Sequence, residues 1–330
     1  MPPEKISIYD IAEKTGTAAS TVSRALDNSA LISRERRGFI QKTARQMGFY
    51  RRSTCRQQNR KIFNISLVLS SAPSAGLNLF YDFSELLAGL KDGLGKIKYH
   101  LSVELIKKNE TSMQNKKAYN PHGIIYAFTT PGIKTIAICR KNHLPVMVLN
   151  RIIKNLSYVS AGNQQGIITL FNRAAEKIKN LKPCFIAYAG NRDISAQRKN
   201  GFLRACKETG IRQGKIFTIK NPDQISAKMA ASLSRHYNLA MCFNDLFALR
   251  LIQMCHQAKI SIPAGLAVTG YDCAPVRNLF IPAIDTITLP VYEMGREAGI
   301  WMREQMIEKK NTLLQKIIPG EYIRGETIHA

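Results

Sequence analysis

From Phe63 onward, short apolar runs rich in β-branched residues alternate with stretches whose apolar residues recur at helical spacing. This alternation constrains the fold more than any other feature, because strands separated by helices pair in parallel and are covered by those helices. The expected strands are 65–69, 123–128, 146–149, 185–189, 240–243 and 267–270, and the expected helices are 83–97, 133–142, 197–209, 246–258 and 291–308. The chain of 330 residues, at about 150 residues per domain, is long enough for two such sheets. We therefore expect an α/β core with two helix-covered parallel sheets.

The first fifty residues follow a different pattern and predict three short helices. Ser7 can cap the first helix, with an acidic residue three positions later as in a capping box, and Gly16 can end it in the left-handed conformation. Val22 and an apolar residue four positions later indicate a second helix over about 18–27, and a third periodic run covers 33–47. Three helices at this spacing, the first two joined across one glycine, are typical of a helix-turn-helix.

The second of these helices has a small, basic outward face. With Val22 pointing inward, a rotation of about 100° per residue places Ser20 and Arg24 on the opposite side, flanked by Ala19 and Ser23. Arginine can pair with guanine or with phosphate, and small neighbours allow a helix to enter the major groove. The formal charge of +25, from 48 Lys+Arg against 23 Asp+Glu, agrees with a polyanionic partner. The alternative is a small helical bundle with a solvated basic surface.

Several other classes of protein are disfavoured. Seven cysteines without CxxC spacing or a metal-type pairing with histidine indicate reduced, mostly buried thiols. The chain has no run of eighteen uncharged apolar residues and no leader-like apolar stretch at its start, so we expect a soluble cytoplasmic protein. P-loop, GxSxG, HExxH and GxGxxG motifs are absent from the sequence. We therefore expect no enzymatic activity, no catalytic residues, no metal and no cofactor.

An ordered string of N-terminal residues carries a family resemblance. The string Tyr9-Asp10-Ile11-Ala12, then Gly16, then Thr21-Val22-Ser23-Arg24-Ala25-Leu26 resembles the opening of the lactose/galactose repressor (LacI/GalR) family of bacterial regulators. The resemblance implies a three-helix helix-turn-helix head and a two-lobed core like that of periplasmic binding proteins. The implied domains are a DNA-binding head over 1–49, a hinge over 50–62 and an effector-binding and dimerisation core over 63–330. Within the core, the first lobe would comprise about 63–162 and 291–323, and the second about 163–290 and 324–330.

The resemblance also assigns DNA contacts. The family's two operator-selecting positions correspond to Ala19 and Ser20, and Arg34 begins a helix whose basic residues would hold phosphates. The family usually has serine at Ala18, and a missing cap costs about 1 kcal/mol unless Thr17 replaces it. The full expected set of DNA contacts is Ser7, Tyr9, Ala19, Ser20, Thr21, Ser23, Arg24, Arg34, Arg56 and Gln58.

The hinge over 50–62 is strongly basic and departs from the family at two positions. In the family this stretch becomes a helix on the operator, and a leucine from each subunit inserts into the minor groove. Gln58 stands at the leucine position, where it can donate a hydrogen bond but lacks the apolar insertion that offsets base unstacking. Arg51 stands where the family has proline, while Arg56 still supplies a phosphate contact. The alternative is a flexible linker that never becomes helical.

The family's effector positions fall at the ends of the expected strands, where parallel sheets bind ligands. A carboxylate, an arginine and an amide can hold the paired hydroxyls of a sugar, and an aromatic ring can cover its apolar face. Each residue also has a structural alternative: Asp245 could cap its helix, Arg198 could form a salt bridge, and Phe83 could belong to the core. The expected effector-binding residues are Phe83, Asn150, Arg151, Arg198, Asn244, Asp245 and Asp272.

Together these features predict a dimeric transcriptional repressor that a small sugar or sugar derivative releases from a near-palindromic double-stranded DNA operator on the nucleoid. A dimer is expected because the chain ends soon after Arg324, without the leucine-repeat tail of tetrameric members. A purine or nucleoside effector is the alternative, disfavoured because Met241 replaces a stacking aromatic residue of purine-responsive relatives. A second alternative is a ligand-binding protein of the periplasmic class without regulatory DNA binding. Residues 107–120 stand where the family commonly has a full helix.

Overall fold

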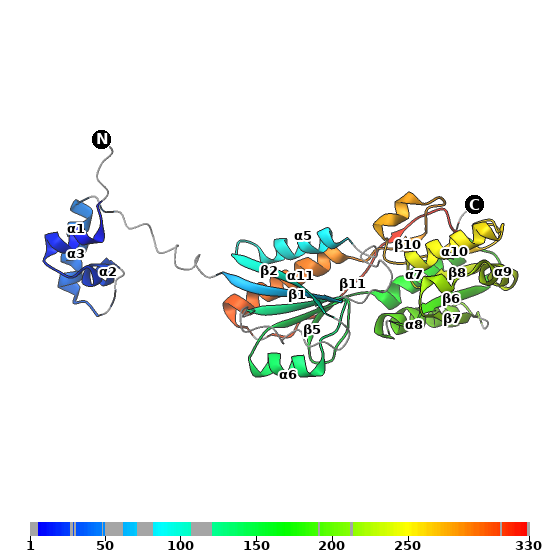
Figure 1. The fold of residues 1–330 in the computed structure, drawn as a ribbon, viewed down its shortest axis with the longest axis horizontal. Coiled ribbons are helices and arrows are strands. Elements are labelled where there is room, and N and C mark those ends of the chain that lie inside the picture. The colour runs from blue at the N-terminus through cyan, green and yellow to red at the C-terminus, as the bar shows by residue number, and fades with distance from the viewer. Residues whose placement is uncertain are drawn as a thin grey trace. The chain divides into compact units, whose positions relative to one another are not determined.

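The computed structural model describes residues 6–26, 29, 31–47, 49, 62–70, 82–106, 121–190, 192–211, 214–310 and 312–328. The chain divides into two compact units, Met1–Lys61 and Ile62–Ala330 (Figure 1). Most of the expected hinge and all of the segment 107–120 lie outside the described residues. Within the described part of the chain, no helix is long and apolar enough to cross a membrane.

In the described residues of the first unit there are three helices, as the sequence predicts: α1 (Ile8–Thr15), α2 (Ala19–Leu26) and α3 (Arg34–Gln46). Ser7 caps α1 through a reciprocal capping box with Asp10, and Gly16 ends the helix with a φ of 59°. Ser33 caps α3 by accepting a hydrogen bond from the Arg36 amide. The helices enclose a small core of Ile11, Ala12, Val22, Ala25, Ile40 and Ala44.

The first sheet of the second unit has six strands in the order β11-β5-β4-β3-β1-β2, and all neighbours are parallel. Its strands are β1 (Phe63–Ser70), β2 (Tyr99–Ile106), β3 (Gly123–Ala127), β4 (Val146–Leu149), β5 (Ser157–Ala161) and β11 (Gln315–Ile318). Successive side chains of β3 alternate between faces: Ile125 packs with α5 (Phe83–Leu94) and α11 (Val291–Glu308), and Ile124 packs with α6 (Ile133–Lys141). Figure 1 shows α5 and α11 side by side on one face and α6 on the other.

Glycines allow α5 and α11 to approach each other closely. A Cβ at Gly89 would lie 2.0 Å from the Tyr292 carbonyl oxygen, and a Cβ at Gly93 would lie 2.1 Å from that of Arg296. On the facing helix, a Cβ at Gly295 would lie 2.5 Å from the Leu86 carbonyl oxygen. The two backbones therefore meet at positions where no larger residue fits.

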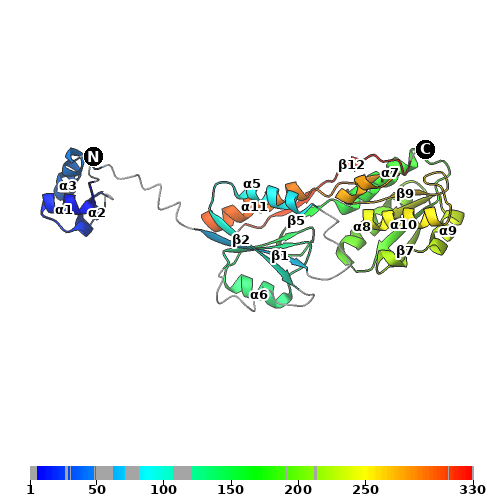
Figure 2. The ribbon, with the colours of Figure 1, turned by 45° about the horizontal axis from the view of Figure 1, so that its top comes forward.

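The second sheet has four parallel strands in the order β7-β6-β8-β9, and Figure 2 labels its two edge strands, β7 and β9. The strands are β6 (Pro183–Tyr188), β7 (Lys215–Ile219), β8 (Leu239–Cys242) and β9 (Ala267–Thr269). One face packs against α7 (Asn163–Ala175) and α8 (Arg192–Glu208), and the other packs against α9 (Ala227–His236) and α10 (Asp245–Gln257). The two parallel sheets with helices on both faces are the α/β core that the alternating pattern predicts.

The C-terminal segment is fastened to the second sheet by one buried carboxylate. Asp285 accepts hydrogen bonds from the amides of Gly325, Thr327 and Ile328 at 2.9 to 3.0 Å. The short antiparallel pair of β10 (Thr286–Ile287) and β12 (Tyr322–Ile323) lies beside this contact, and Tyr322 packs against the second-sheet core. Two 3-10 helices, η2 (Pro222–Gln224) and η3 (Pro275–Leu279), also lie in the described part of this unit. β12 pairs with β10, whose Ile287 is buried in the second-sheet core.

Candidate functional site

The outward face of α2 carries the residues that the helical rotation places there. Val22 is buried, whereas Ser20 and Arg24 are exposed, and Ala19, Thr21 and Ser23 are half-buried at its edges. The side-chain amide of Gln41 on α3 donates a 2.9 Å hydrogen bond to the Ala25 carbonyl, which ties α2 to α3. The helix therefore has a buried side that packs on the other two helices and an outward side of small residues around one exposed arginine.

Other expected DNA contacts surround this face or lie outside the described residues. Tyr9 on α1 is 70% exposed, and Arg34 is exposed at the start of α3. Ser7 is committed to the N-terminus of α1, because both its amide and its hydroxyl donate to Asp10 Oδ2, at 2.6 and 2.8 Å. Arg56 and Gln58 lie outside the described residues.

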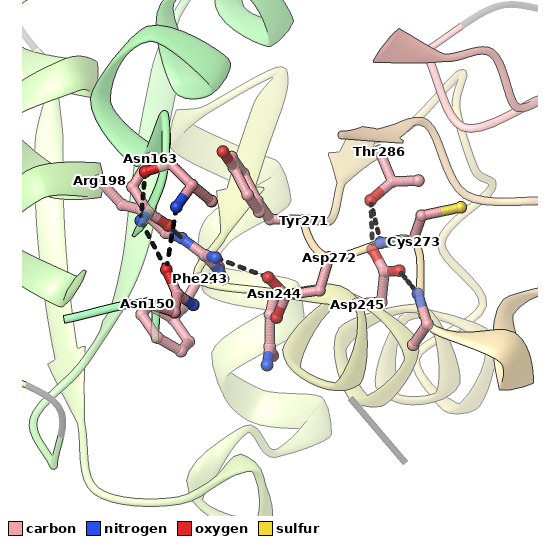
Figure 3. A network of polar contacts seen from close by, with 12 residues as sticks. Asn150, Asn163, Arg198, Phe243, Asn244, Asp245, Tyr271, Asp272, Cys273 and Thr286 are labelled. Atoms are coloured by element: carbon pink, nitrogen blue, oxygen red, sulfur yellow. Dashed lines mark hydrogen bonds and ion pairs between the residues drawn. The ribbon is translucent and has the colours of Figure 1, made fainter. Parts of the chain in front are cut away.

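In the second unit, polar side chains gather at the carboxyl ends of β8 and β9 (Figure 3). Asn244 and Asp245 follow β8, Asp272 follows β9, and Arg198 reaches the same place from α8. All four residues are buried, Arg198 to 1% exposure. The structure therefore brings together the four expected effector residues of the second lobe.

Arg198 is held on every side. Its Nη2 donates to Asp272 Oδ1 at 2.6 Å, its Nη1 to the Phe243 carbonyl at 2.5 Å, and its Nε to Asn163 Oδ1 at 2.9 Å. The guanidinium carbon lies 3.7 Å from the centre of the Tyr271 ring and 4.8 Å from that of Phe243. A buried charge survives only when it is paired and hydrogen-bonded, and both conditions hold here.

Asp272 adopts an unusual backbone conformation that presents its carboxylate to Arg198. Its φ is 93°, a value that side-chain-bearing residues rarely adopt. Its amide donates to the Ile287 carbonyl at 2.8 Å, and its own carbonyl accepts from Leu289 at 3.2 Å. These two hydrogen bonds hold the backbone in its strained conformation. Strained backbone conformations of this kind cluster at functional sites.

Asp245 has a structural role in this geometry. Its Oδ2 accepts from the Ala274 amide and its Oδ1 from the Thr286 hydroxyl, both at 2.6 Å. Burial raises the pKa of Asp245 to about 7, against the opposing effect of these two hydrogen bonds. The two oxygens thus connect α10 to the loop after β9 and to the first residue of β10. Asn244 caps α10, because its side chain accepts a hydrogen bond from the Phe247 amide at 3.3 Å. The cap of this helix is therefore Asn244 and not Asp245, which is the first helical residue.

The expected effector residues of the first lobe lie in two places: near the crossover, where the chain passes from the first sheet to the second at Gly162–Asn163, and at the first-sheet core. Asn150 is buried with a φ of 52°, and its Oδ1 accepts from Asn163 Nδ2 at 3.2 Å. Arg151 donates to the carbonyls of Asn150 and Phe128, which fixes the chain after β4. Phe83 opens α5, and its partly buried side chain packs against the first-sheet core.

Several residues of the network were absent from the predicted site. Asn163, Phe243 and Tyr271 were not among the expected effector-binding residues. Their positions within two residues of the ends of β5, β8 and β9 were the available signal. Met241, which the sequence comparison treated as a ligand-stacking position, is fully buried in the core beneath α7 and α8. Met241 therefore gives no reason to disfavour a purine.

A cavity of about 370 Å³ opens beside the crossover. Asn163, which accepts a hydrogen bond from Arg198, lines this cavity. None of the predicted effector residues lines it. Its walls are Ile152, Ala161, Gly162, Asn163, Gln164, Gln165, Gln197, Arg204 and Ile317. Because its walls come from strands of the first sheet and from α7 and α8, which cover the second sheet, the cavity lies where the two lobes meet.

Comparison with known proteins agrees with the two units. Residues 7–52 match bacterial regulatory proteins of the lacI family, and residues 178–328 match the periplasmic binding protein-like domain. The ribose operon repressor of Bacillus subtilis (strain 168) is 26% identical over 332 residues, which cover 97% of this chain and 98% of that protein. The transcriptional repressor CytR of Escherichia coli (strain K12) is 24% identical over 316 residues, covering 91% of this chain and 89% of that protein.

Solved structures share the fold. The lac repressor dimer bound to operator and the anti-inducer ONPF has a TM-score of 0.66 at 15% identity, covering 99% of this chain and 100% of that one. A regulator from Enterococcus faecium with bound ribose has a TM-score of 0.66 at 18% identity, covering 80% of this chain and 98% of that one. A helix-turn-helix head followed by a periplasmic-binding-type core defines a class of DNA-binding regulators. The chain carries the DNA-binding domain of the lacI family of bacterial regulatory proteins and is similar to repressors of that kind over nearly its whole length.

Proposed function

We propose that this protein is a dimeric, cytoplasmic transcriptional repressor that binds a near-palindromic operator through α2 and releases it when a small neutral sugar binds among the second-lobe strand ends. The observation that carries the proposal is the buried pair of Arg198 and Asp272 at the carboxyl ends of the second sheet, 2.6 Å apart. Parallel sheets bind ligands at this edge, and the pair places a donor and an acceptor there.

The hydrogen-bonding capacity left at this site suits a polyol. Within the described part of the chain, the second oxygen of Asp272 and the amide nitrogen of Asn244 have no hydrogen-bond partner. A carboxylate oxygen can accept from two neighbouring hydroxyls, and an amide nitrogen can donate to a third. Asp272 already neutralises Arg198, so the pair has no net charge with which to attract a phosphate or a carboxylate. We infer a neutral sugar, bound non-covalently.

A pentose is the first candidate within this class. The ribose operon repressor of Bacillus subtilis matches nearly the whole chain, and a regulator of the same fold from Enterococcus faecium has bound ribose. Asn150, Arg151 and Phe83 would face the ligand from the first lobe when the lobes close. Asp245 and Asn244 would shape the second-lobe side by holding α10 in place.

On DNA, Arg24 and Ser20 would read base edges in the major groove, and Ala19 would permit close approach. Tyr9, Ser7, Thr21 and Ser23 would contact the backbone or bases around this helix. Arg34 and the hinge residue Arg56 would contact phosphates, and Gln58 would meet the minor groove. The basic charge of the chain supports rapid, salt-dependent association with DNA.

A thermal-shift and titration panel tests the ligand class. The full-length protein would be mixed separately with D-ribose, ribose 5-phosphate, D-gluconate and adenosine. A ligand at about 100 times its Kd stabilises the folded state by about 2.7 kcal/mol, so ribose is expected to raise the Tm clearly. Stabilisation by the phosphate or the acid, with none by ribose, would overturn the neutral-sugar proposal.

Genomic footprinting tests the DNA-binding half of the proposal. We expect protection of short near-palindromic sites, and release of those sites by the stabilising ligand. Asp272→Ala is expected to keep operator binding and lose the release, because the mutation removes the acceptor without touching the head. Binding that ignores sequence and fades uniformly with salt would contradict a specific repressor.

A further inference from the structure

We infer that Asn163 is the positioning residue through which the effector site acts on the first lobe. Three hydrogen bonds in series connect Asp272, at the end of β9, to Asn150, at the end of β4 (Figure 3). Asn163 is the middle residue of this series and is fully buried. The inference rests on the proposed effector site and adds the route by which that site acts on the first lobe.

The first step joins the ligand-facing carboxylate to a rigid cation. Asp272 Oδ1 accepts from Arg198 Nη2 at 2.6 Å. The rings of Tyr271 and Phe243 flank the guanidinium at 3.7 and 4.8 Å. A planar group held between two rings can shift within its own plane more easily than it can tilt. Ligand that withdraws Asp272 from Arg198 would therefore displace the guanidinium along this plane.

The second step passes that displacement to the crossover. Arg198 Nε donates to Asn163 Oδ1 at 2.9 Å, and the Nε lies in the guanidinium plane. Asn163 is the first residue of α7, directly after Gly162, and α7 has no side-chain cap. The residue that receives the displacement therefore stands where the chain passes from the first sheet to the second.

The third step enters the first lobe. Asn163 Nδ2 donates to Asn150 Oδ1 at 3.2 Å and to the Ala161 carbonyl at 3.1 Å. Asn150 Oδ1 also accepts from the Ala161 amide at 3.4 Å, and its backbone amide donates to Val159 at 2.8 Å. Asn150 thereby joins the ends of β4 and β5.

Donor-only groups at the two ends of the series, Arg198 and the Ala161 amide, determine which atom donates and which accepts in the hydrogen bonds of Asn163. Arg198 Nε can only donate, so Asn163 must present its oxygen to it. The Ala161 amide can only donate, so Asn150 must present its oxygen there, and Asn163 must offer its nitrogen to that oxygen. The position therefore requires a side chain that accepts on one side and donates on the other. Asparagine satisfies both, whereas aspartate accepts from Arg198 but cannot donate to Asn150.

Hydrogen–deuterium exchange in a mutant cycle tests this connection without any ligand. The full-length wild type would be compared with Asp272→Asn, Asn163→Ala and the double mutant. In the wild-type background, Asp272→Asn is expected to raise exchange of the amides of residues 150–161 roughly fivefold, the effect of losing about one buried hydrogen bond. In the Asn163→Ala background, the same substitution should change that exchange less than about twofold.

The outcome distinguishes a relay from a merely structural asparagine. If Asn163 is only structural, Asn163→Ala will raise the exchange of residues 150–161 by itself, and Asp272→Asn will have the same effect in both backgrounds. Such additive effects of the two mutations would overturn the inference. Asn238→Ala is the matched control, because Asn238 also bonds backbone groups but only within the second lobe, including the Lys182 amide at 2.7 Å. If Asn163→Ala does not fold, Asn163→Asp replaces it in the same cycle.

Operator binding gives the functional readout. At saturating concentrations of the ligand that the panel identifies, Asn163→Ala should reduce the ligand-induced change in operator Kd by about tenfold or more. Full release of the operator by Asn163→Ala would contradict the inference and leave the proposed function standing. If no ligand in the panel binds, the proposed function fails, and the exchange cycle alone decides whether the two lobes are connected through Asn163.

Discussion

The Tyr271 ring covers one face of the Arg198 guanidinium at 3.7 Å, and the ring is itself locked by α7. A Cβ at Gly166 would lie 2.3 Å from the Tyr271 hydroxyl, so the glycine on α7 makes the space that the tyrosine occupies. Two helices and a strand end thus fix one arginine before any ligand binds. Such preorganisation lowers the cost of binding.

Removal of the ring should therefore weaken ligand binding. Tyr271→Leu is expected to lower ligand affinity by up to about 2 kcal/mol, the value of a desolvated cation–π contact, because the guanidinium loses its fixed plane. Tyr271→Phe is the control, since it keeps the ring and loses only a 3.5 Å contact from the hydroxyl to the Gly162 carbonyl. Isothermal titration would measure both, and equal losses in the two variants would contradict the role of the ring.

Two mutations in the DNA-binding head can distinguish a residue that contacts bases from one that contacts phosphates. Arg24→Ala is expected to cost about 1 to 3 kcal/mol of specific operator affinity and to relax the preference for one base, because Arg24 is exposed on the outward face of α2. Lys42→Ala, exposed on α3, should weaken operator and random DNA alike and reduce the salt slope by about 1. Fluorescence anisotropy at several salt concentrations separates the two patterns. Equal loss on both DNAs for Arg24→Ala would remove it from the reading face.

Asp245 should make stability depend on pH. Burial raises its pKa to about 7 from the ordinary 3.8, so between about pH 4 and pH 7 the folded state binds more protons than the unfolded state. The free energy of unfolding should then fall as pH rises through this window, by up to about 4 kcal/mol, and level off above pH 7. Asp272, which raises the pKa, and Arg277, which lowers it, are the charges that act on Asp245.

Urea unfolding of wild type and Asp245→Asn at pH 5, 6, 7 and 8 measures this effect. The difference in unfolding free energy between the two proteins should shift in favour of the asparagine variant as pH rises from 5 to 7. Asparagine keeps an acceptor for the Ala274 amide and stays neutral at every pH. Parallel stability curves would show that Asp245 does not titrate in this range.

The contact between α5 and α11 should tolerate no added methyl group. Gly93→Ala is expected to destabilise the protein by about 1 to 3 kcal/mol, because its Cβ would lie 2.1 Å from the Arg296 carbonyl oxygen and the helices would have to separate. Gly38→Ala is the matched control: Gly38 also lies inside a helix, α3, but has open space around its Cβ. That variant should gain up to about 1 kcal/mol from helix propensity in the first unit. Thermal unfolding followed by circular dichroism would compare them, and a neutral Gly93→Ala would disprove the tight contact.

Local sequence patterns predicted much of the fold. The strand expected over 146–149 and the helix expected over 291–308 have these bounds in the structure, and the three helices of the head occupy their expected places. Elements with weak local signals were not predicted. β2 is an edge strand with half-exposed alternation, and α7 begins after Gly162 without a side-chain cap, so neither has the boundary signal on which sequence analysis depends.

The sequence by itself determined the class of protein, because an ordered N-terminal string resembles that of a known family and because capping residues, helical rotation and strand alternation are encoded within a few neighbouring positions. It also indicated that Arg198 and Asp272 belong to one site. Only the tertiary structure decided the roles of individual residues. Asp245 accepts hydrogen bonds from Ala274 and Thr286, and Asn163 lies between Arg198 and Asn150 and bonds to both. Contacts between residues far apart in the chain depend on how two sheets meet, and no local pattern contains that geometry.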